Sequence, residues 1–359
     1  MSDAARDSAT PDPSPRDAAT SATGFDPAEL AIALSHYDTG VIAEIRPIRR
    51  GSGDAPKAIL RTSRGALLFK RRGKARSNPE RVAFSHQLQL HLASRGYPLP
   101  RLLGTRGENN SMLRLGDRLY ELFEYVAGTA YAGDERETRA AGRALAILHR
   151  LTADFHPQTS PPARGFHGSA AVSRNLEHIS GRGGDEGEVA ARLGALYLNA
   201  RDEADTHGYA GWPRQVVHGD WHPGNVVFKN GEVAAAIDYD AAHVDARCAD
   251  VASGALQFSL IRGGQELESW PAEPELGRLG WFLTGYDGVD GCRLSDSELR
   301  VAPWLMAESL IAEAAGPVAE TGSFGRHDGA EFLRMIERKA TWLTEHPERV
   351  RGSLEQSSS

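Results

Sequence analysis

The sequence predicts an α+β protein with two lobes, a small strand-rich first lobe and a larger, mainly helical second lobe. Three observations lead to this prediction. Residues 41–126 hold strand-like apolar runs separated by Gly, Ser and Asn turns, with one helical pattern between them. From residue 134 onward, most apolar residues recur at helical intervals. Within this helical part, residues 216–240 contain one short β-hairpin pattern.

Composition excludes several classes of protein. The chain of 359 residues is 40% hydrophobic and 25% charged, and no apolar run approaches the ~20 residues of a membrane span. Its net charge of −7 argues against a nucleic-acid partner. Two cysteines, Cys248 and Cys292, are too few for a disulfide framework or a cysteine metal site. We therefore expect a cytoplasmic protein with no membrane or nucleic-acid partner.

The expected organisation has four parts. Residues 1–24, rich in Ala, Ser, Pro and Asp, predict a disordered leader without a secretion signal. Residues 25–126 form the first lobe, with an antiparallel sheet and one helix. Residues 127–350 form the second lobe, and residues 351–359 form a flexible tail.

The first lobe should open with paired strands over residues 41–72. Gly51 and Gly53 mark one turn, and the run "ALLFK" is a strand that ends at Lys70. Eleven Lys or Arg residues against one acid over residues 46–76 indicate either a solvated basic face or a site for a polyanion such as nucleotide phosphates. A helix should follow from Pro79 to Arg95, and further strands lead to residue 126.

The hairpin in the second lobe brings candidate metal ligands together. Asn230-Gly231 is a strong two-residue turn signal. If Lys229 faces Glu232, Asn225 lies opposite about Ala236, and Asp238 follows at the same open end. Amide and carboxylate oxygens are ligands that Mg²⁺ prefers, and Mg²⁺ completes its shell with phosphates and water. Asn225 and Asp238 therefore predict a magnesium nucleotide rather than a closed metal cage.

Asp220 lies five residues before Asn225 on the loop "HGDWHPGN". Glycines and a proline favour an irregular loop here. A carboxylate that projects from such a loop beside a metal can accept the proton of a reacting hydroxyl. Asp220 is therefore the candidate general base.

These residues resemble the catalytic segment of the aminoglycoside phosphotransferase-like family, which are small-molecule kinases with a protein-kinase-like fold. The matching motifs are "HGDWHPGNVVF" and "AAAIDYD". The resemblance implies a catalytic β-hairpin, ATP and Mg²⁺ as cofactors, Asp220 as catalytic base, and Asn225 and Asp238 as metal ligands. It also implies that His218 and Asp250 support the catalytic loop. Gly219 stands where protein kinases carry Arg, which favours a small-molecule substrate.

The resemblance extends more weakly through residues 40–320. It implies that Lys70 holds nucleotide phosphates, that the loop with Gly51 and Gly53 covers them, and that the backbone of Glu124 and Val126 binds adenine in a nucleotide-binding lobe. One departure concerns the helix after the lysine strand, where the family carries a glutamate paired with that lysine. Here the helix reads "VAFSHQLQLHL", and Glu80 in its first turn is the nearest acid.

The resulting interpretation is a kinase that moves the ATP γ-phosphate to a hydroxyl of a small molecule. One alternative is a nucleotide-binding pseudokinase, because the helix acid is missing. Another is a metal-dependent phosphoesterase that uses His218, Asp220 and His222 with Asp154 and His156. Acceptors in the family include aminoglycosides, homoserine, choline-like alcohols and sugars, and the sequence does not select among them. Asp240, Glu308 and Glu313 receive no role.

Overall fold

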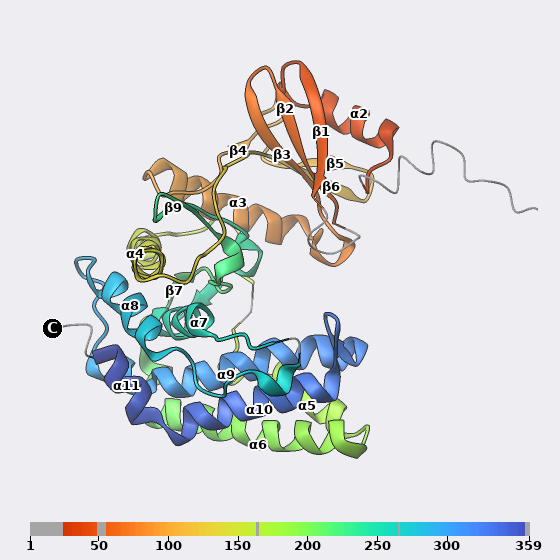
Figure 1. Ribbon diagram of the computed structural model, residues 1–359. Helices are drawn as coiled ribbons and strands as arrows, with labels where there is room; N and C mark the ends of the chain where they lie inside the picture. Colours follow the sequence, from red (N-terminus) through yellow and green to blue (C-terminus); the bar gives the residue numbers. More distant parts are fainter. Residues whose placement is uncertain (1–23, 49–54, 163–164, 265, 356–359) are drawn as a thin grey trace, which may run out of the picture. The chain divides into compact units, whose positions relative to one another are not determined.

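The computed structural model describes residues 24–48, 55–162, 165–264 and 266–355 (Figure 1). Gly51 and Gly53 lie outside the described residues, and so does the predicted leader except for Gly24. The chain divides into two compact units. Unit 1 contains the chain up to His86 together with Pro100–Val126, and unit 2 contains Gln87–Leu99 and the chain from Ala127 onward.

Unit 1 is built around an antiparallel sheet. Its strands run in the order β1-β2-β3-β6-β4, and β5 also pairs with β6. The elements are α2 (Pro27–Ser35), β1 (Ile42–Ile48), β2 (Lys57–Thr62), β3 (Gly65–Arg71), the 3₁₀ turn η1 (Lys74–Arg76), α3 (Pro79–Ser94), β4 (Leu102–Leu103), β5 (Leu113–Leu115) and β6 (Arg118–Glu124). Helix α3 crosses from unit 1 into unit 2.

The two faces of this sheet differ in chemistry. Phe69 of β3 and Tyr120 and Leu122 of β6 are buried with Phe25 and Leu30 in one apolar core beside α2. Because side chains alternate along a strand, Lys70 and Arg72 lie on the opposite face, and so does Glu121, which pairs with Lys70 in the β3–β6 register. The sheet therefore has an apolar face and a charged face.

Helix α2 corrects the expectation of a single helix in the first lobe. It is short, and its start depends on Asp26, whose carboxylate accepts from the backbone amides of Ala28 and Glu29. Glu29 then forms ion pairs with Arg71 of β3 and Arg118 of β6, at 2.8 and 2.7 Å. These contacts hold the helix on the apolar face of the sheet.

Unit 2 is mainly helical. Its elements are α4 (Glu135–Thr152), α5 (Ala170–Ser180), α6 (Gly184–Thr206), η2 (Tyr209–Gly211), β7 (Gln215–Val217), η3 (Pro223–Asn225), β8 (Val226–Lys229), β9 (Glu232–Ala236), η4 (Tyr239–Ala241), β10 (His243–Asp245), α7 (Arg247–Ser259), η5 (Leu267–Ser269), α8 (Leu276–Asp287), α9 (Asp296–Thr321), β11 (Ser323–Phe324), β12 (His327–Asp328), α10 (Gly329–Glu345) and α11 (Pro347–Glu355). The predicted α+β class, with its hairpin inside a helical part, is confirmed.

Helices α4 and α8 pack closely enough to require small residues. A Cβ on Gly142 of α4 would lie 1.9 Å from the carbonyl oxygen of Phe282, and one on Gly285 of α8 would lie 1.9 Å from that of Arg139. A side chain at either position would force the two helices apart. The close contact positions α4, which carries His149 to Asp250 beneath the loop between β7 and β8.

Helix α11 ends later than the sequence predicts. It runs to Glu355, so residues 351–355, which the sequence places in the tail, are helical. Val350 and Leu354 are buried, and this spacing of four residues puts both on the inner face of the helix. Residues 356–359 lie outside the described part of the chain.

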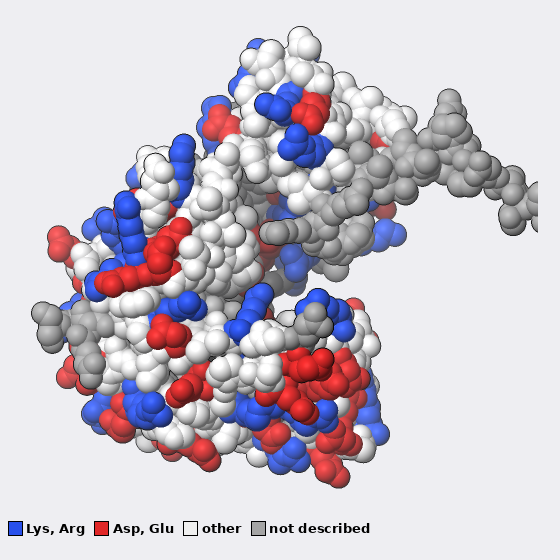
Figure 2. All heavy atoms as spheres, in the orientation of Figure 1, with Lys and Arg blue, Asp and Glu red and all other residues white. Residues whose placement is uncertain are grey.

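Acidic and basic side chains are interspersed on the face of the helical unit that Figure 2 shows. Ion pairs link α6 and α10, where Arg192 contacts Glu337 at 2.5 Å and Arg334 contacts Asp185. In the described part of the chain, no helix is long and apolar enough to cross a membrane.

Candidate active site

The loop between β7 and β8 carries the candidate base, Asp220. Antiparallel pairing of β7 with β10 fixes the start of this loop, where Val217 lies opposite His243. The turn η3 fixes its end, since the His222 ring nitrogen Nδ1 accepts from the backbone amide of Gly224 at 3.0 Å. The loop therefore has little freedom at either end.

His218 holds the middle of this loop. Its ring is fully buried, and it lies edge-on to Trp221 with ring centroids 5.2 Å apart. Nδ1 accepts from the backbone amide of Asp220 at 3.3 Å, and Nε2 donates to the carbonyl of Ile237 at 3.2 Å. Burial lowers the pKa of His218, so the ring is neutral. In this tautomer Nδ1 is only an acceptor and Nε2 is only a donor. This histidine links the candidate base to the residue that precedes Asp238.

Asp250, in the first turn of α7, holds the loop from the other side. Its carboxylate accepts from the backbone amides of His218 at 2.8 Å and Gly219 at 3.0 Å. Nε2 of His149 lies 3.0 Å from the same carboxylate, and the other ring nitrogen contacts the Tyr286 hydroxyl at 2.8 Å. Burial alone would raise the pKa of Asp250, but His149 and the other donors outweigh it and lower that pKa. The carboxylate is therefore charged at neutral pH.

The hairpin brings Asn225 and Asp238 closer together than the sequence predicts. Lys229 does face Glu232, but a bulge follows, so Val227 pairs with Ala235 instead of Ala234. The backbone amide of Ile237 donates to the Asn225 carbonyl at 2.9 Å. Asn225 thus lies opposite Ile237, beside Asp238, rather than opposite Ala236. The extra residue on β9 causes this shift, which favours a shared ion.

Both candidate ligands are held in defined conformations. The amide nitrogen of Asn225 donates to the Asp220 carbonyl and to Asp220 Oδ2, each at 2.9 Å, so Oδ1 is the atom that a cation would contact. Asp238 has φ 63° and ψ 72°, the left-handed region that costs a residue other than glycine of order 1–3 kcal/mol. Strain of this kind accumulates at functional sites, and here it occurs at the predicted metal ligand.

The surroundings of Asp220 keep its carboxylate ionised. Partial burial would raise its pKa, but His222, whose Nε2 lies 3.7 Å from Oδ1, together with Asn225, outweighs burial and lowers it. About half of the Asp220 side chain is exposed. A charged, accessible carboxylate on a rigid loop can orient a hydroxyl and take its proton.

Gly219 provides a direct test of the loop geometry. Its φ is 75°, and a Cβ would lie 2.5 Å from the Ala241 carbonyl oxygen and 2.7 Å from Nδ1 of His243. We expect Gly219→Ala to lower the free energy of unfolding by about 2 kcal/mol or more. Since small displacements of a reacting group can cost about 100-fold in rate, turnover should fall at least about tenfold. Thermal melting and steady-state kinetics measure both effects.

Gly194 is the matched control for this substitution. It lies inside helix α6 with nothing within 4 Å of its missing Cβ, so Gly194→Ala should leave turnover unchanged and raise stability by roughly 0.5–1 kcal/mol. Equal effects of the two substitutions would contradict the geometry described for the catalytic loop.

In unit 1, the structure pairs Lys70 with a residue that the sequence did not suggest. Lys70 Nζ lies 3.7 Å from Oε2 of Glu121, whereas Glu80, the helix acid considered above, is exposed in the first turn of α3. Glu121 lies in the middle of the strand "RLYELFE", between the apolar residues Tyr120 and Leu122. A carboxylate inside an apolar strand is the sequence signal that could have identified Glu121 as the partner of Lys70, because a buried charge requires an opposite charge beside it.

The predicted adenine segment lies at the end of β6. The backbone amide of Glu124 donates to the Arg101 carbonyl, and that of Tyr125 donates to the Ala66 carbonyl, each at 2.9 Å. An adenine at this segment would therefore meet the carbonyl of Glu124 and the amide of Val126.

The ligand set of the phosphoesterase alternative is not assembled. Asp154 is exposed and forms an ion pair with Arg95 at 3.8 Å, and His156 is exposed too. Within the residues that the structure describes, no three His, Cys, Asp or Glu side chains are grouped so that they could hold a metal ion. A two-residue site of Asn225 and Asp238, completed by phosphates, needs no such group.

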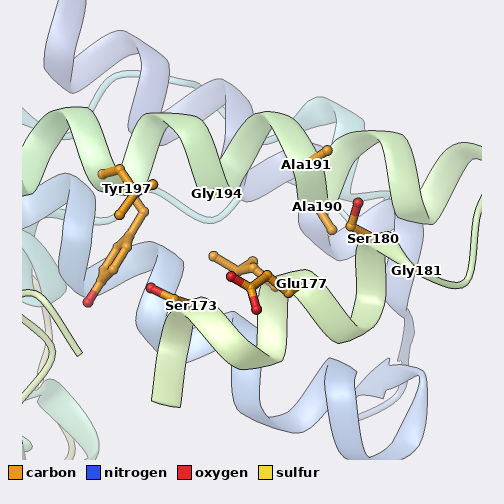
Figure 3. Close-up of a pocket in the computed structure, with 10 residues that line it drawn as sticks. Ser173, Glu177, Ser180, Gly181, Ala190, Ala191, Gly194 and Tyr197 are labelled. Carbon is orange, nitrogen blue, oxygen red and sulfur yellow. The ribbon is translucent and has the colours of Figure 1, made fainter. Parts of the chain in front are cut away.

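A groove of about 450 Å³ between α5 and α6 contains none of the candidate residues (Figure 3). Glu177 contributes the carboxylate among the residues that line it. The hydroxyl of Tyr197, another lining residue, accepts from the Ser169 amide and donates to the Phe166 carbonyl. The groove therefore lacks the paired groups that acid–base chemistry requires.

Comparisons with known proteins show which family and fold this chain resembles. The sequence profile described as "Phosphotransferase enzyme family" matches residues 44–292. A homoserine kinase of Beijerinckia indica is 29% identical over 269 residues, covering 73% of this chain and 76% of that protein. An amicoumacin kinase structure aligns with a TM-score of 0.66 and 14% identity, over 89% of this chain and 94% of that one. A microcompartment-associated aminopropanol kinase aligns with a TM-score of 0.66 and 15% identity, over 88% and 97%.

Proposed function

Because this chain belongs to the phosphotransferase enzyme family, and is therefore a small-molecule kinase, we propose that it transfers the γ-phosphate of Mg²⁺-ATP to the hydroxyl of a small amine-bearing alcohol. The observation that carries the proposal is the constellation of Asp220, Asn225 and Asp238 on one rigid loop and hairpin. Neither the pseudokinase nor the phosphoesterase alternative has support from the comparisons.

Asn225 and Asp238 would hold the metal ion. Their side chains offer one amide oxygen and one carboxylate, a hard-oxygen donor set that suits Mg²⁺. When bound, Mg²⁺ would neutralise part of the phosphate charge. Lys70 would hold the nucleotide phosphates, and the carbonyl of Glu124 and the amide of Val126 would bind adenine.

Asp220 would orient the acceptor hydroxyl and receive its proton. It is ionised at neutral pH because its pKa is lowered, despite partial burial, by His222 and Asn225. His218 and Asp250 position the backbone of the loop without contacting the acceptor. In this scheme Asp220 is the proton acceptor, and His218 and Asp250 fix the loop that carries it.

Glu313 on α9 supports a cationic acceptor. Its carboxylate accepts from Gln257 Nε2 at 2.6 Å. Partial burial raises the pKa of Glu313, the Gln257 hydrogen bond opposes the rise, and the Asp220 carboxylate adds to it. A second carboxylate that influences the candidate base favours an acceptor with an ammonium group. Homoserine, on which the relative at 29% identity is named to act, carries both an ammonium and a hydroxyl and is the first acceptor to test.

The test is release of ADP with ATP, Mg²⁺ and L-homoserine, followed by detection of the phosphorylated product. Ethanolamine, choline and an aminoglycoside extend the series, and glycerol serves as an uncharged hydroxyl control. We expect acceptor-dependent ADP release that stops on removal of Mg²⁺ with EDTA and that favours amine-bearing acceptors over glycerol. Hydrolysis of phosphoesters without nucleotide would instead support the phosphoesterase alternative.

A further inference from the structure

On the charged face of the sheet in unit 1, Lys70 pairs with an acid that the family resemblance does not imply. The helix after the lysine strand carries His86 at its middle instead of a glutamate. A lysine that binds phosphates has a long, flexible side chain. Fixing that side chain in one conformation costs up to about 2 kcal/mol of conformational entropy, unless a neighbouring group already holds it in place. A carboxylate outside this helix can supply such a neighbour for Lys70.

Glu121 is completely buried on β6, directly opposite Lys70 of β3. Directly opposed residues of antiparallel strands project on the same face of the sheet, so the two side chains meet because of the strand register. The Lys70 side chain is 15% exposed and Oε2 of Glu121 lies 3.7 Å from its ammonium group. This contact is an ion pair at a longer distance than a hydrogen bond.

The two oxygens of Glu121 have different surroundings. Oε1 accepts from Arg72 at 2.9 Å and contacts Nε2 of His86 at 2.6 Å, while the other ring nitrogen of His86 contacts the Ser111 hydroxyl at 2.9 Å. Among the described residues, Oε2 accepts no hydrogen bond, although it is buried. Oε1 is thus fixed by two donors, and Oε2 is directed toward Lys70.

Charge explains why this carboxylate can stay buried. Burial alone would raise the pKa of Glu121, but Lys70, His86 and Arg72 outweigh burial and hold that pKa well below its usual range. A charged group without such partners would be expelled or neutralised. The carboxylate is therefore ionised at neutral pH.

We infer that Glu121 is the positioning residue for the phosphate-binding lysine, and that His86 holds Glu121 in place of the helix acid that this chain lacks. The inference rests on the proposed function, in which Lys70 contacts ATP. Glu121 does not touch the substrate in this scheme. It acts by restricting the ammonium group of Lys70 to one side of the sheet.

The first experiment compares Glu121→Gln with Glu29→Gln. Glu29 forms ion pairs with two arginines on the opposite face of the same sheet, so its substitution reports the structural cost alone. We expect Glu121→Gln to raise the KM for ATP about tenfold or more with an unchanged KM for the acceptor, and Glu29→Gln to lower the Tm without changing the KM for ATP. A Glu121→Gln enzyme with wild-type ATP kinetics would overturn the inference.

A carboxylate swap tests the geometry. In His86→Glu/Glu121→Gln the acid returns to the helix at a position that now contacts Glu121 at 2.6 Å. We expect this double variant to recover at least part of the ATP affinity that Glu121→Gln loses. If Glu121→Gln does not fold, Glu121→Asp keeps the buried charge but withdraws it from Lys70 by one methylene group. A raised KM for ATP in Glu121→Asp supports the inference, and an unchanged value overturns it.

Lys70→Met separates failure of this inference from failure of the proposed function. Wild-type turnover in Lys70→Met would remove the proposed phosphate contact, and Glu121 would have no lysine to position. Loss of ATP affinity in Lys70→Met together with wild-type kinetics in Glu121→Gln would leave the kinase assignment intact and refute the positioning by Glu121 alone.

Discussion

Asp220→Asn is expected to lower kcat by about 10² to 10⁴ while leaving nucleotide binding unchanged, because removal of a general base in a fixed site has effects of this size. Asparagine is the informative substitution. Its side-chain oxygen can still accept from the Asn225 amide, which now donates to Asp220 Oδ2 at 2.9 Å. The backbone amide of residue 220 can still donate to His218. Loss of turnover would therefore report the missing proton acceptor and not a collapsed loop.

The measurement is single-turnover phosphotransfer to homoserine, or to the best acceptor found, with Mg²⁺-ATP affinity measured on the same samples. Asp154→Asn is the matched control, because Asp154 is an exposed aspartate that only the phosphoesterase alternative requires. It should leave turnover unchanged and alter stability by less than about 0.5 kcal/mol. Normal turnover in Asp220→Asn, or loss of turnover in Asp154→Asn, would refute the assignment of the base.

The sequence predicted that the candidate residues of the second unit would lie together, because they are close to one another in the chain. Asp220, Asn225 and Asp238 fall within 216–240, and one Asn-Gly turn is enough to place an entrance and an exit at the same end of a hairpin. The bulge between Val227 and Phe228 was missed, because nothing in the run "EVAAAID" distinguishes a regular pair from a bulged one. The error moved Asn225 by one pairing position and left the metal hypothesis unaffected.

The first unit was predicted less completely for a topological reason. Lys70 and Glu121 meet only because β3 pairs with β6, and the intervening chain includes a helix and two short strands. Sequence patterns specify such long-range register weakly, so the missing helix acid suggested Glu80 instead. Helix α2 escaped prediction because it spans nine residues and its stability comes from contacts of Glu29 with the sheet rather than from a strong internal pattern.

Asp238→Asn is expected to abolish the stabilisation that Mg²⁺-ATP confers. A ligand present at 100 times its Kd stabilises the folded state by about 2.7 kcal/mol, which corresponds to a Tm increase of roughly 3–5 °C for a chain of this length. We expect the wild-type protein to show such a rise with Mg²⁺-ATP and to lose most of it with ATP and EDTA. The variant should behave in Mg²⁺ as the wild type behaves in EDTA, since its side chain is no longer an anionic ligand.

Asparagine again avoids an ambiguity, because it tolerates the left-handed conformation that Asp238 adopts at φ 63°. Alanine at this position would add backbone strain and confuse a loss of metal binding with a loss of stability. Asp202→Asn, which changes a largely exposed aspartate on α6, controls for the lost charge and should retain the full Mg²⁺-dependent rise. An unchanged rise in Asp238→Asn would remove this residue from the metal site. Because the hairpin places Asn225 beside Asp238 and in contact with Asp220, that outcome would refute the shared geometry of base and metal on which the proposed phosphotransfer depends.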